Sequence, residues 1–361
     1  MDQLEWIITI AKPLIVLVLL LQVVPIMVWV ERRGSALMQN RLGPNRLGPL
    51  GLFQSLADAA KFIAKEDPTP GHVVPFFYRL APIVCLIPSF MTFAVMPFAA
   101  PLTVDGRTII FQAANLDVGL LYILSVASLG VFGIIMAGWA SNSKYALLGS
   151  LRSSSQMISY ELSMGLSIVG IIMAFSSVQL GEIAAAQGQT LLQLGPIAIP
   201  KWGVFIQPLG FIIFLTSVYA ETNRLPFDLP EGESEIVAGY HLEYGAMTFA
   251  TFFMAEYVNM ATASAFVATL YFGGFQMLPG FSFLHEMMGL TGNAHEWARV
   301  ALQSVSFLFK VGFFMWLFVW VRWTLPRFRY DQLMDLGWKV MLPLSLANVV
   351  VTAALIYYKV I

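Results

Sequence analysis

The chain has 361 residues, of which 58% are hydrophobic and only 11% are charged, with a formal net charge of -1. A soluble domain carries about 25% charged residues, so this composition excludes a soluble two-domain protein and leaves much of the surface facing lipid. The balanced charge gives no sign of nucleic-acid binding, and the single cysteine, Cys85, excludes an internal disulfide or an iron–sulfur cluster built on this chain alone.

Eight apolar runs are long enough to cross a bilayer, since a spanning helix needs about 20 mostly apolar residues. The first run lacks the basic start and cleavage site of a signal peptide, so it should remain as an anchor. The sixth, about 50 Å long as one straight helix, must tilt, bend or project from the bilayer. We therefore predict an all-α integral membrane protein, with residues 1–361 as a single polytopic domain. The predicted spans are 13–30, 76–98, 118–139, 157–176, 203–220, 240–272, 300–322 and 338–358.

The connection between the first two spans contains an amphipathic segment. Apolar residues recur at helical spacing on one face and polar residues on another, which predicts a helix over about residues 50–66 lying along the membrane surface. Before it, the unit Arg-Leu-Gly-Pro occurs twice. Each Gly-Pro pair predicts a turn, so two turns present Arg41 and Arg46.

Lysine and arginine are divided unevenly between the two sides of the predicted membrane. One set of connections holds 14 of them, the other set holds five, and Lys310 lies inside a span. The positive-inside rule places the richer side in the cytoplasm, or in the mitochondrial matrix. Both termini then face outward, as an even number of spans requires.

Ionisable residues lie inside or beside the predicted spans, where a charge at the bilayer centre costs about 2.5–3.5 kcal/mol. Several such residues favour a protein-lined polar path; the alternatives are a static buried network or placement at the membrane interface. If both belong to one straight helix, Glu243 and Glu256 lie about 220° apart and share no face. The ionisable set is Glu161, Glu221, Glu243, Glu256 and Lys310.

The connection after the fifth span, about residues 221–240, is acidic on the side where the rest of the protein is basic. Two prolines and Phe227 favour a fixed shape over a solvated loop. Carboxylates crowded in this way have coupled proton affinities, which suits them to accept protons near neutral pH. Its ionisable residues are Glu221, Arg224, Asp228, Glu231, Glu233 and Glu235.

Motifs for bound cofactors are missing from the sequence. There is no phosphate loop and no dinucleotide fingerprint, and the four histidines lack the spacing of haem or zinc-protease ligands. We predict no metal site. Any redox role must therefore be shared with partner proteins.

Several charged motifs carry a family resemblance. The chain resembles the H-subunit family of respiratory NADH–quinone oxidoreductase (complex I), the counterpart of mitochondrial NADH dehydrogenase subunit 1. The matching pieces follow the family's order along the whole chain. They are Glu31-Arg32-Arg33, residues 39–45, Leu56-Ala57-Asp58 with Lys65-Glu66, Ser159-Tyr160-Glu161-Leu162, residues 221–235, Ala255-Glu256-Tyr257 and residues 326–332.

The resemblance implies a subunit of a proton-translocating enzyme. Quinone is then the substrate, entering from the bilayer between the first span, the surface helix and the sixth span. The implied tunnel residues are Glu31, Arg32, Arg33, Arg41, Arg46, Asp58 and Phe227. The implied path for protons or coupling comprises Glu161, Glu221, Arg224, Asp228, Glu231, Glu233, Glu235, Glu243, Glu256 and Lys310.

The resemblance also implies partners and a location. No cofactor is bound covalently here; FMN and iron–sulfur clusters belong to partner subunits. Soluble quinone-site and iron–sulfur subunits dock on the cytoplasmic side, and small and antiporter-like subunits lie beside the chain in the bilayer. The implied location is the bacterial inner membrane, or alternatively the mitochondrial inner membrane.

Two other functions remain open from the sequence. One is the equivalent anchor protein of a membrane-bound hydrogenase, which differs in its electron donor. The other is a secondary transporter, for which inverted repeats and broken helices are expected and are not seen. Residues 118–139 contain none of the acids that some relatives carry there, and residues 274–298 suggest no function.

Overall fold

The computed structural model describes residues 3–104, 107–194, 197–229, 237–278, 281 and 292–358. Its first half contains α1 (Gln3–Met38), the 3-10 turn η1 (Pro49–Gly51), α2 (Gln54–Ala64), α3 (Pro75–Phe93), α4 (Gly119–Ala140), α5 (Lys144–Phe175) and α6 (Leu180–Ala186). The second half contains α7 (Gly203–Ile206), α8 (Pro208–Glu221), the turn η2 (Gly239–His241), α10 (Ala246–Tyr271), α12 (Asn293–Thr324), α13 (Tyr330–Asp335), the π-helical turn η3 (Leu336–Met341) and α14 (Leu342–Tyr357).

Two short antiparallel hairpins interrupt the helices. Strand β1 (Leu102–Val104) pairs with β2 (Arg107–Ile109), with Thr103 opposite Thr108. Strand β3 (Thr190–Leu194) pairs with β4 (Ile197–Pro200), with Leu192 opposite Ile199. Neither hairpin was expected from the sequence, because both are too short to show a clear alternation of apolar and polar residues.

The predicted fold class, an all-α membrane protein, is confirmed. Within the described residues, six helical segments are long and apolar enough to cross a bilayer. Predicted runs 203–220 and 240–272 correspond to α8, an apolar helix of 14 residues, and to α10, of 26 residues. The count of eight spans, and the description of the chain as one domain, stay predictions.

Two helix boundaries differ from the prediction for the same physical reason. Helix α1 continues to Met38, past Glu31 and Arg32, because partners on other helices satisfy these charges. Helix α5 begins at Lys144, well before the predicted start at 157, on a stretch rich in serine. Charged and small polar residues weaken an apolar pattern without stopping a helix that packs against others.

The sixth predicted run is not one long helix. The turn η2 covers residues 239–241 and α10 begins only at Ala246, whose φ of 43° breaks the helical path. A helix of 26 residues is about 39 Å long, which is shorter than the roughly 50 Å expected for the whole run as one straight helix. The predicted surface helix is also shorter than expected, because η1 occupies its first residues and α2 ends at Ala64.

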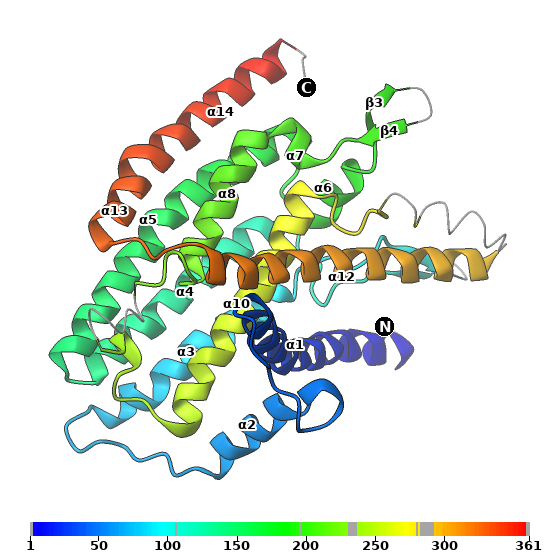
Figure 1. Cartoon of the computed structure of the whole chain (residues 1–361). Coiled ribbons are helices and arrows are strands. Elements are labelled where there is room, and N and C mark those ends of the chain that lie inside the picture. The colour runs from blue at the N-terminus through cyan, green and yellow to red at the C-terminus, as the bar shows by residue number, and fades with distance from the viewer. Residues whose placement is uncertain are drawn as a thin grey trace.

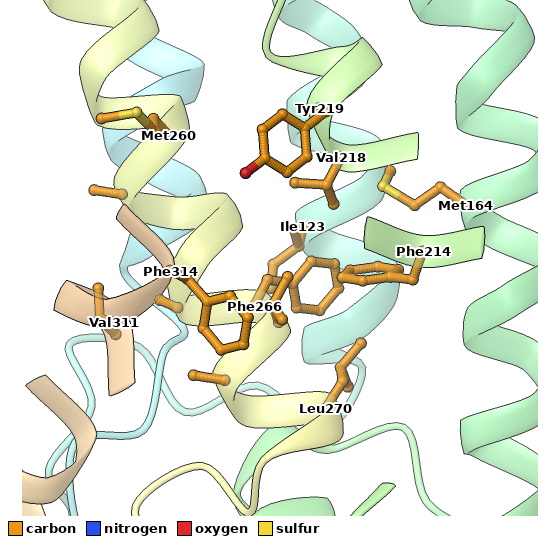
Figure 2. Close-up of a cluster of buried hydrophobic side chains, with 14 of the residues drawn as sticks. Ile123, Met164, Phe214, Val218, Tyr219, Met260, Phe266, Leu270, Val311 and Phe314 are labelled. Atoms are coloured by element: carbon orange, nitrogen blue, oxygen red, sulfur yellow. The ribbon is translucent and has the colours of Figure 1, made fainter. Parts of the chain in front are cut away.

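Helix α10 is the centre of the bundle (Figure 1). It packs against α3 on one side and against α1 and α12 on the other, while α5 packs against α4, α8 and α14. Figure 2 shows the apolar core that these helices share. The core side chains labelled there come from α4, α5, α8, α10 and α12, namely Ile123, Met164, Phe214, Val218, Tyr219, Met260, Phe266, Leu270, Val311 and Phe314.

Large apolar side chains also cover the outside of the bundle. On α1 they include Ile15 and Val18, exposed by 59% and 54%, and on α12 Phe309 and Phe313, exposed by 63% and 50%. Such surfaces suit a lipid environment, because a soluble monomer rarely exposes large contiguous apolar patches. Cys85 is buried in a cluster between α3 and α4, as expected for a small hydrophobic residue.

Candidate functional site

An ion pair fastens the surface helix α2 to the end of α1. Arg32 donates a hydrogen bond of 2.5 Å to Asp58, which also lies 3.9 Å from Lys61. Arg33 donates to the backbone carbonyls of Pro44 and Leu50, at 3.1 and 3.0 Å. These contacts hold the segment between α1 and α2 in a fixed path, so three predicted tunnel residues lie together at one junction.

Arg41 and Arg46, the arginines of the two repeated turns, are both exposed. Arg41 donates to the side chain of Gln39 at 2.7 Å. Gly48, in the second turn, and Gly51, just after it, have φ values of 73° and 74°. An added side chain at Gly51 would clash with the backbone of Pro44, so the close return of the chain here requires glycine.

Glu31 is the centre of a buried cluster of charges. Its carboxylate forms an ion pair with Arg322 of α12, accepts a hydrogen bond of 2.8 Å from the hydroxyl of Tyr257, and lies 3.7 Å from Arg224. Its side chain is only 12% exposed. A carboxylate removed from water in this way needs cationic partners, and here two guanidinium groups and one hydroxyl serve it.

Arg224 connects this cluster to the polar part of α10. One terminal nitrogen lies 3.7 Å from Glu31 and the other lies 3.7 Å from Glu256, and the guanidinium stacks 4.4 Å from the ring of Tyr257. Glu256 also accepts a hydrogen bond of 3.2 Å from Tyr240 in η2. A single cation therefore lies between a predicted tunnel residue and a predicted coupling residue.

Glu221 and Glu256 line one cavity, whose other lining residues come mostly from α3, α4, α5, α8 and α10. The cavity has about 80 Å³ of room for water-sized molecules. One water needs roughly 10–15 Å³ of such space. Several waters can therefore fit in the cavity that the two carboxylates line, and Asn259 and Ser89 add polar groups to the lining.

Glu161 continues the series of acids beyond the cavity. It accepts a short hydrogen bond from the hydroxyl of Ser128 on α4, and it lies within electrostatic range of Glu221. Glu161 follows Tyr160, which is fully buried. A series of charged residues thus extends from α1 across the bundle to α5, in the order Glu31, Arg224, Glu256, Glu221 and Glu161.

The first part of the acidic connection is held by several neighbours. Gln156 donates to the carbonyls of Ala220 and Phe227, at 2.7 and 2.8 Å. Phe227, predicted to line the tunnel, is 4% exposed and stacks against Phe328 with 5.4 Å between ring centroids. Phe227 and the residues up to 229 are thus packed against neighbouring helices, and a fixed shape for the whole connection stays a prediction.

Asp228 pairs with the segment that precedes α13. Arg327 donates to it at 3.0 Å, and the amide of Phe328 donates to the carbonyl of Pro226 at 3.1 Å. The motif at 326–332 thus supports the acidic connection. Three other predicted path residues, Glu231, Glu233 and Glu235, lie outside the described residues.

Glu243 and Lys310 have other partners than the predicted path residues that the structure describes. Glu243 precedes α10, so the expectation that it shares one helix with Glu256 is wrong; it lies 3.4 Å from His72. Lys310 donates to the carbonyls of Gly274 and Gln276 at 2.9 and 2.6 Å, beyond the opposite end of α10 from Glu243.

Four contributors to the site were missed by the sequence reasoning. Arg322 was counted only for orientation, because an arginine in the last turn of a membrane helix usually extends to the interface. Tyr240, Tyr257 and Ser128 are neutral, so no cost of burying a charge pointed to them. Within the described residues, no group of three or more His, Cys, Asp and Glu side chains could hold a metal ion.

Comparisons with known proteins agree on one family. A family model described as NADH dehydrogenase matches residues 11–353. A Bdellovibrio bacteriovorus protein, named as the H subunit of NADH-quinone oxidoreductase, is 47% identical over 373 residues, covering 96% of this chain and 95% of the relative. A Koribacter versatilis protein, also named as an H subunit of NADH-quinone oxidoreductase, is 45% identical over 365 residues, covering 96% of both chains. A Rhodothermus marinus protein named NADH-quinone oxidoreductase subunit 8 is 46% identical over 328 residues, covering 91% of both chains. The chain belongs to the H-subunit family of NADH-quinone oxidoreductase, the family that its charged motifs resemble.

Proposed function

We propose that this chain forms the membrane part of a quinone tunnel and couples quinone reduction to proton translocation. The observation that supports it most strongly is the position of Arg224, with 3.7 Å to Glu31 on one side and 3.7 Å to Glu256 on the other. Glu31 lies at the predicted tunnel and Glu256 lines the cavity shared with Glu221. One guanidinium can therefore interact with both carboxylates.

The proposed entrance for the quinone lies between α1, α2 and α10. These helices pack against one another, and α2 exposes Leu56 and Ile63, which suit the membrane surface. The Arg32–Asp58 pair braces the entrance. A quinone has an apolar tail and a polar head group, so a passage with lipid on one side and buried charges at its inner end matches its chemistry.

The proposed coupling is electrostatic. When quinone chemistry changes the charge near Glu31, the attraction between Glu31 and Arg224 changes, and so does the attraction of Arg224 for Glu256. At 3.7 Å and an effective dielectric constant of 20, each contact is worth about 4–5 kcal/mol of Coulomb energy. Glu256 can then exchange a proton with water in the cavity, and Glu221 and Glu161 continue the path.

The electron carriers belong to partner subunits in this proposal. A flavin and iron–sulfur clusters on soluble subunits deliver electrons to the quinone from the cytoplasmic side, where the acidic connection docks. Small and antiporter-like subunits accept the coupling signal within the bilayer. The bacterial names of the relatives support the bacterial inner membrane, and the basic asymmetry supports termini on the outside.

Separate assays of electron input and quinone use test the tunnel. Asp58→Ala and Arg41→Ala should slow quinone reduction by the assembled complex, while electron transfer from NADH to a soluble acceptor stays normal. The matched control is Glu296→Ala, which breaks the ion pair of 2.6 Å with Arg299 at the other end of α12 from Arg322. Equal loss of both activities in Asp58→Ala and Arg41→Ala would count against a tunnel at α1 and α2.

A further inference from the structure

The last helix of the chain contains a π-helical turn at the point where it passes α5. Helix α13 ends at Asp335, η3 follows from Leu336 to Met341, and α14 begins at Leu342, whose amide donates to the carbonyl of Gly337 five residues earlier. A π-helical turn holds one more residue than an α-helical turn and is uncommon. Such turns often occur at functional sites.

The burial pattern shows what the extra residue does. Along an α-helix, the 12 residues from Leu333 to Ser345 rotate by about 1200°, which is about 120° beyond three whole turns. Removing one residue leaves a rotation of about 1100°, or about 20° beyond three turns. Leu333 and Ser345 are both fully buried, although a rotation of about 120° would place them on different faces. The π-helical turn therefore absorbs one residue and keeps the buried positions before and after it on one face.

Residues of α13 and η3 contact the part of α5 that leads to Glu161. The hydroxyls of Tyr330 and Ser155 lie 2.9 Å apart, and the hydroxyl of Tyr160 donates to the carbonyl of Leu333 at 2.9 Å. The indole of Trp338, inside η3, donates to the hydroxyl of Ser159 at 3.1 Å. Figure 1 shows α13 and α14 running along α5.

Gly337 brings the backbone of η3 against the ring of Tyr160. A carbon added at Gly337 would lie 3.3 Å from that ring, so a side chain here would push the ring aside. The ring of Tyr160 also packs against Phe227 with 5.8 Å between centroids. Tyr160 is thus held between η3 and the acidic connection, and the next residue along α5, Glu161, meets Ser128.

We propose that η3 is a positioning element for Glu161, with Gly337 and Trp338 as its positioning residues. This inference rests on the proposed role of Glu161 in the coupling path. The turn fixes the rotation of α5 about its own axis at residues 155–160. The carboxylate of Glu161 is thereby directed at Ser128 and kept within electrostatic range of Glu221.

Deleting Val340, which is 43% exposed, converts the turn to α-helix while leaving the flanking buried faces aligned. If η3 is only an irregularity, the deletion is tolerated. If η3 positions Glu161, the assembled complex should show a kcat for quinone reduction lower by on the order of tenfold, with an unchanged KM for quinone, because a misplaced group slows the step it serves. Val340→Ala keeps the turn and should have normal kcat.

A second variant keeps the helix intact in case the deletion fails to assemble. Trp338→Phe retains a large ring and removes the hydrogen bond to Ser159, and should lower kcat about three- to tenfold. Ser159→Ala removes the same bond, so the double variant should be no slower than either single one.

Combination with Glu161→Gln separates the two proposals. If η3 acts through Glu161, neither the deletion nor Trp338→Phe slows Glu161→Gln further. Two results would contradict the inference while leaving the proposed function intact, both with a lowered kcat for Glu161→Gln alone. In one, the η3 variants have a normal kcat. In the other, each η3 variant lowers the kcat of Glu161→Gln by the same factor as it lowers the kcat of the unmodified complex. If Glu161→Gln alone has a normal kcat, the proposed role of Glu161 is wrong, and the inference, which rests on it, is wrong as well.

Discussion

Arg224→Gln removes the cation that lies between two buried carboxylates. Breaking a buried pair by deleting one partner typically costs about 3–5 kcal/mol, because the remaining charge is left in a low dielectric. Glu31 keeps Arg322 and the hydroxyl of Tyr257, and Glu256 keeps the neutral hydroxyl of Tyr240. Each carboxylate thus keeps some of its contacts, so we expect a loss of stability near the lower end of this range.

The double variant Arg224→Gln with Glu256→Gln tests this assignment. Replacing the carboxylate that loses this cation should recover part of the stability lost by Arg224→Gln, while quinone-linked turnover stays slow because the connection between tunnel and cavity is gone. Stability is measured as the rate of thermal inactivation of NADH oxidation by the purified complex. Turnover is measured with a short-chain quinone and normalised to electron transfer from NADH to a soluble acceptor.

Arg327→Gln is the matched control for the loss of an arginine near the acidic connection. Its partner is Asp228 and its own side chain is 33% exposed, against 7% for Arg224, so we expect a smaller loss of stability than for Arg224→Gln. The reasoning fails if Arg224→Gln and its double variant with Glu256→Gln are equally unstable. It also fails if Arg224→Gln turns over quinone at the normal rate.

Two further predictions concern Lys310 and the orientation of the chain. Lys310→Met should lower the amount of assembled complex, because the carbonyls of Gly274 and Gln276 lose a donor; the proton-to-electron ratio of the complex that does assemble should be normal when measured in vesicles. In a Cys85→Ser background, an impermeant thiol reagent applied to intact cells should label a cysteine at Gln189 and not one at Gln39, both of which are exposed; the opposite labelling would reverse the predicted orientation.

Apolar runs predicted where helices exist better than where they begin and end. The runs at 76–98, 118–139 and 300–322 each correspond to one helix, because uniform apolar sequence leaves few other structures in a bilayer. The start of α5 was missed because Ser150, Ser153 and Ser154 make its first half polar, although all three are buried. Burial against neighbouring helices compensates for polarity that a hydropathy window penalises.

The identity of the charged residues could be predicted, but their pairing could not. The cost of burying charge pointed to Glu161 and Glu256, and the family resemblance pointed to Glu31, yet Arg322 is 291 residues from Glu31 in the sequence. No periodic pattern reports a contact over that distance. The length of the sixth run indicated a tilt, a bend or a projection, but the position of the break before α10 was missed, since Tyr240 and His241 continue the mostly apolar run although they belong to the turn η2.

The proposed coupling is tested most directly by measuring the proton-to-electron ratio, together with quinone turnover, in sealed vesicles. The complexes to compare carry Glu161→Gln, Glu221→Gln or Glu256→Gln. Glutamine keeps the shape of glutamate and cannot ionise. Each variant should therefore assemble, and both turnover and pumping should fall together, while aspartate at the same position retains part of the activity because it can still exchange a proton. If all three glutamine variants assemble and pump at the normal rate and ratio, these glutamates are structural and the proposed path is wrong.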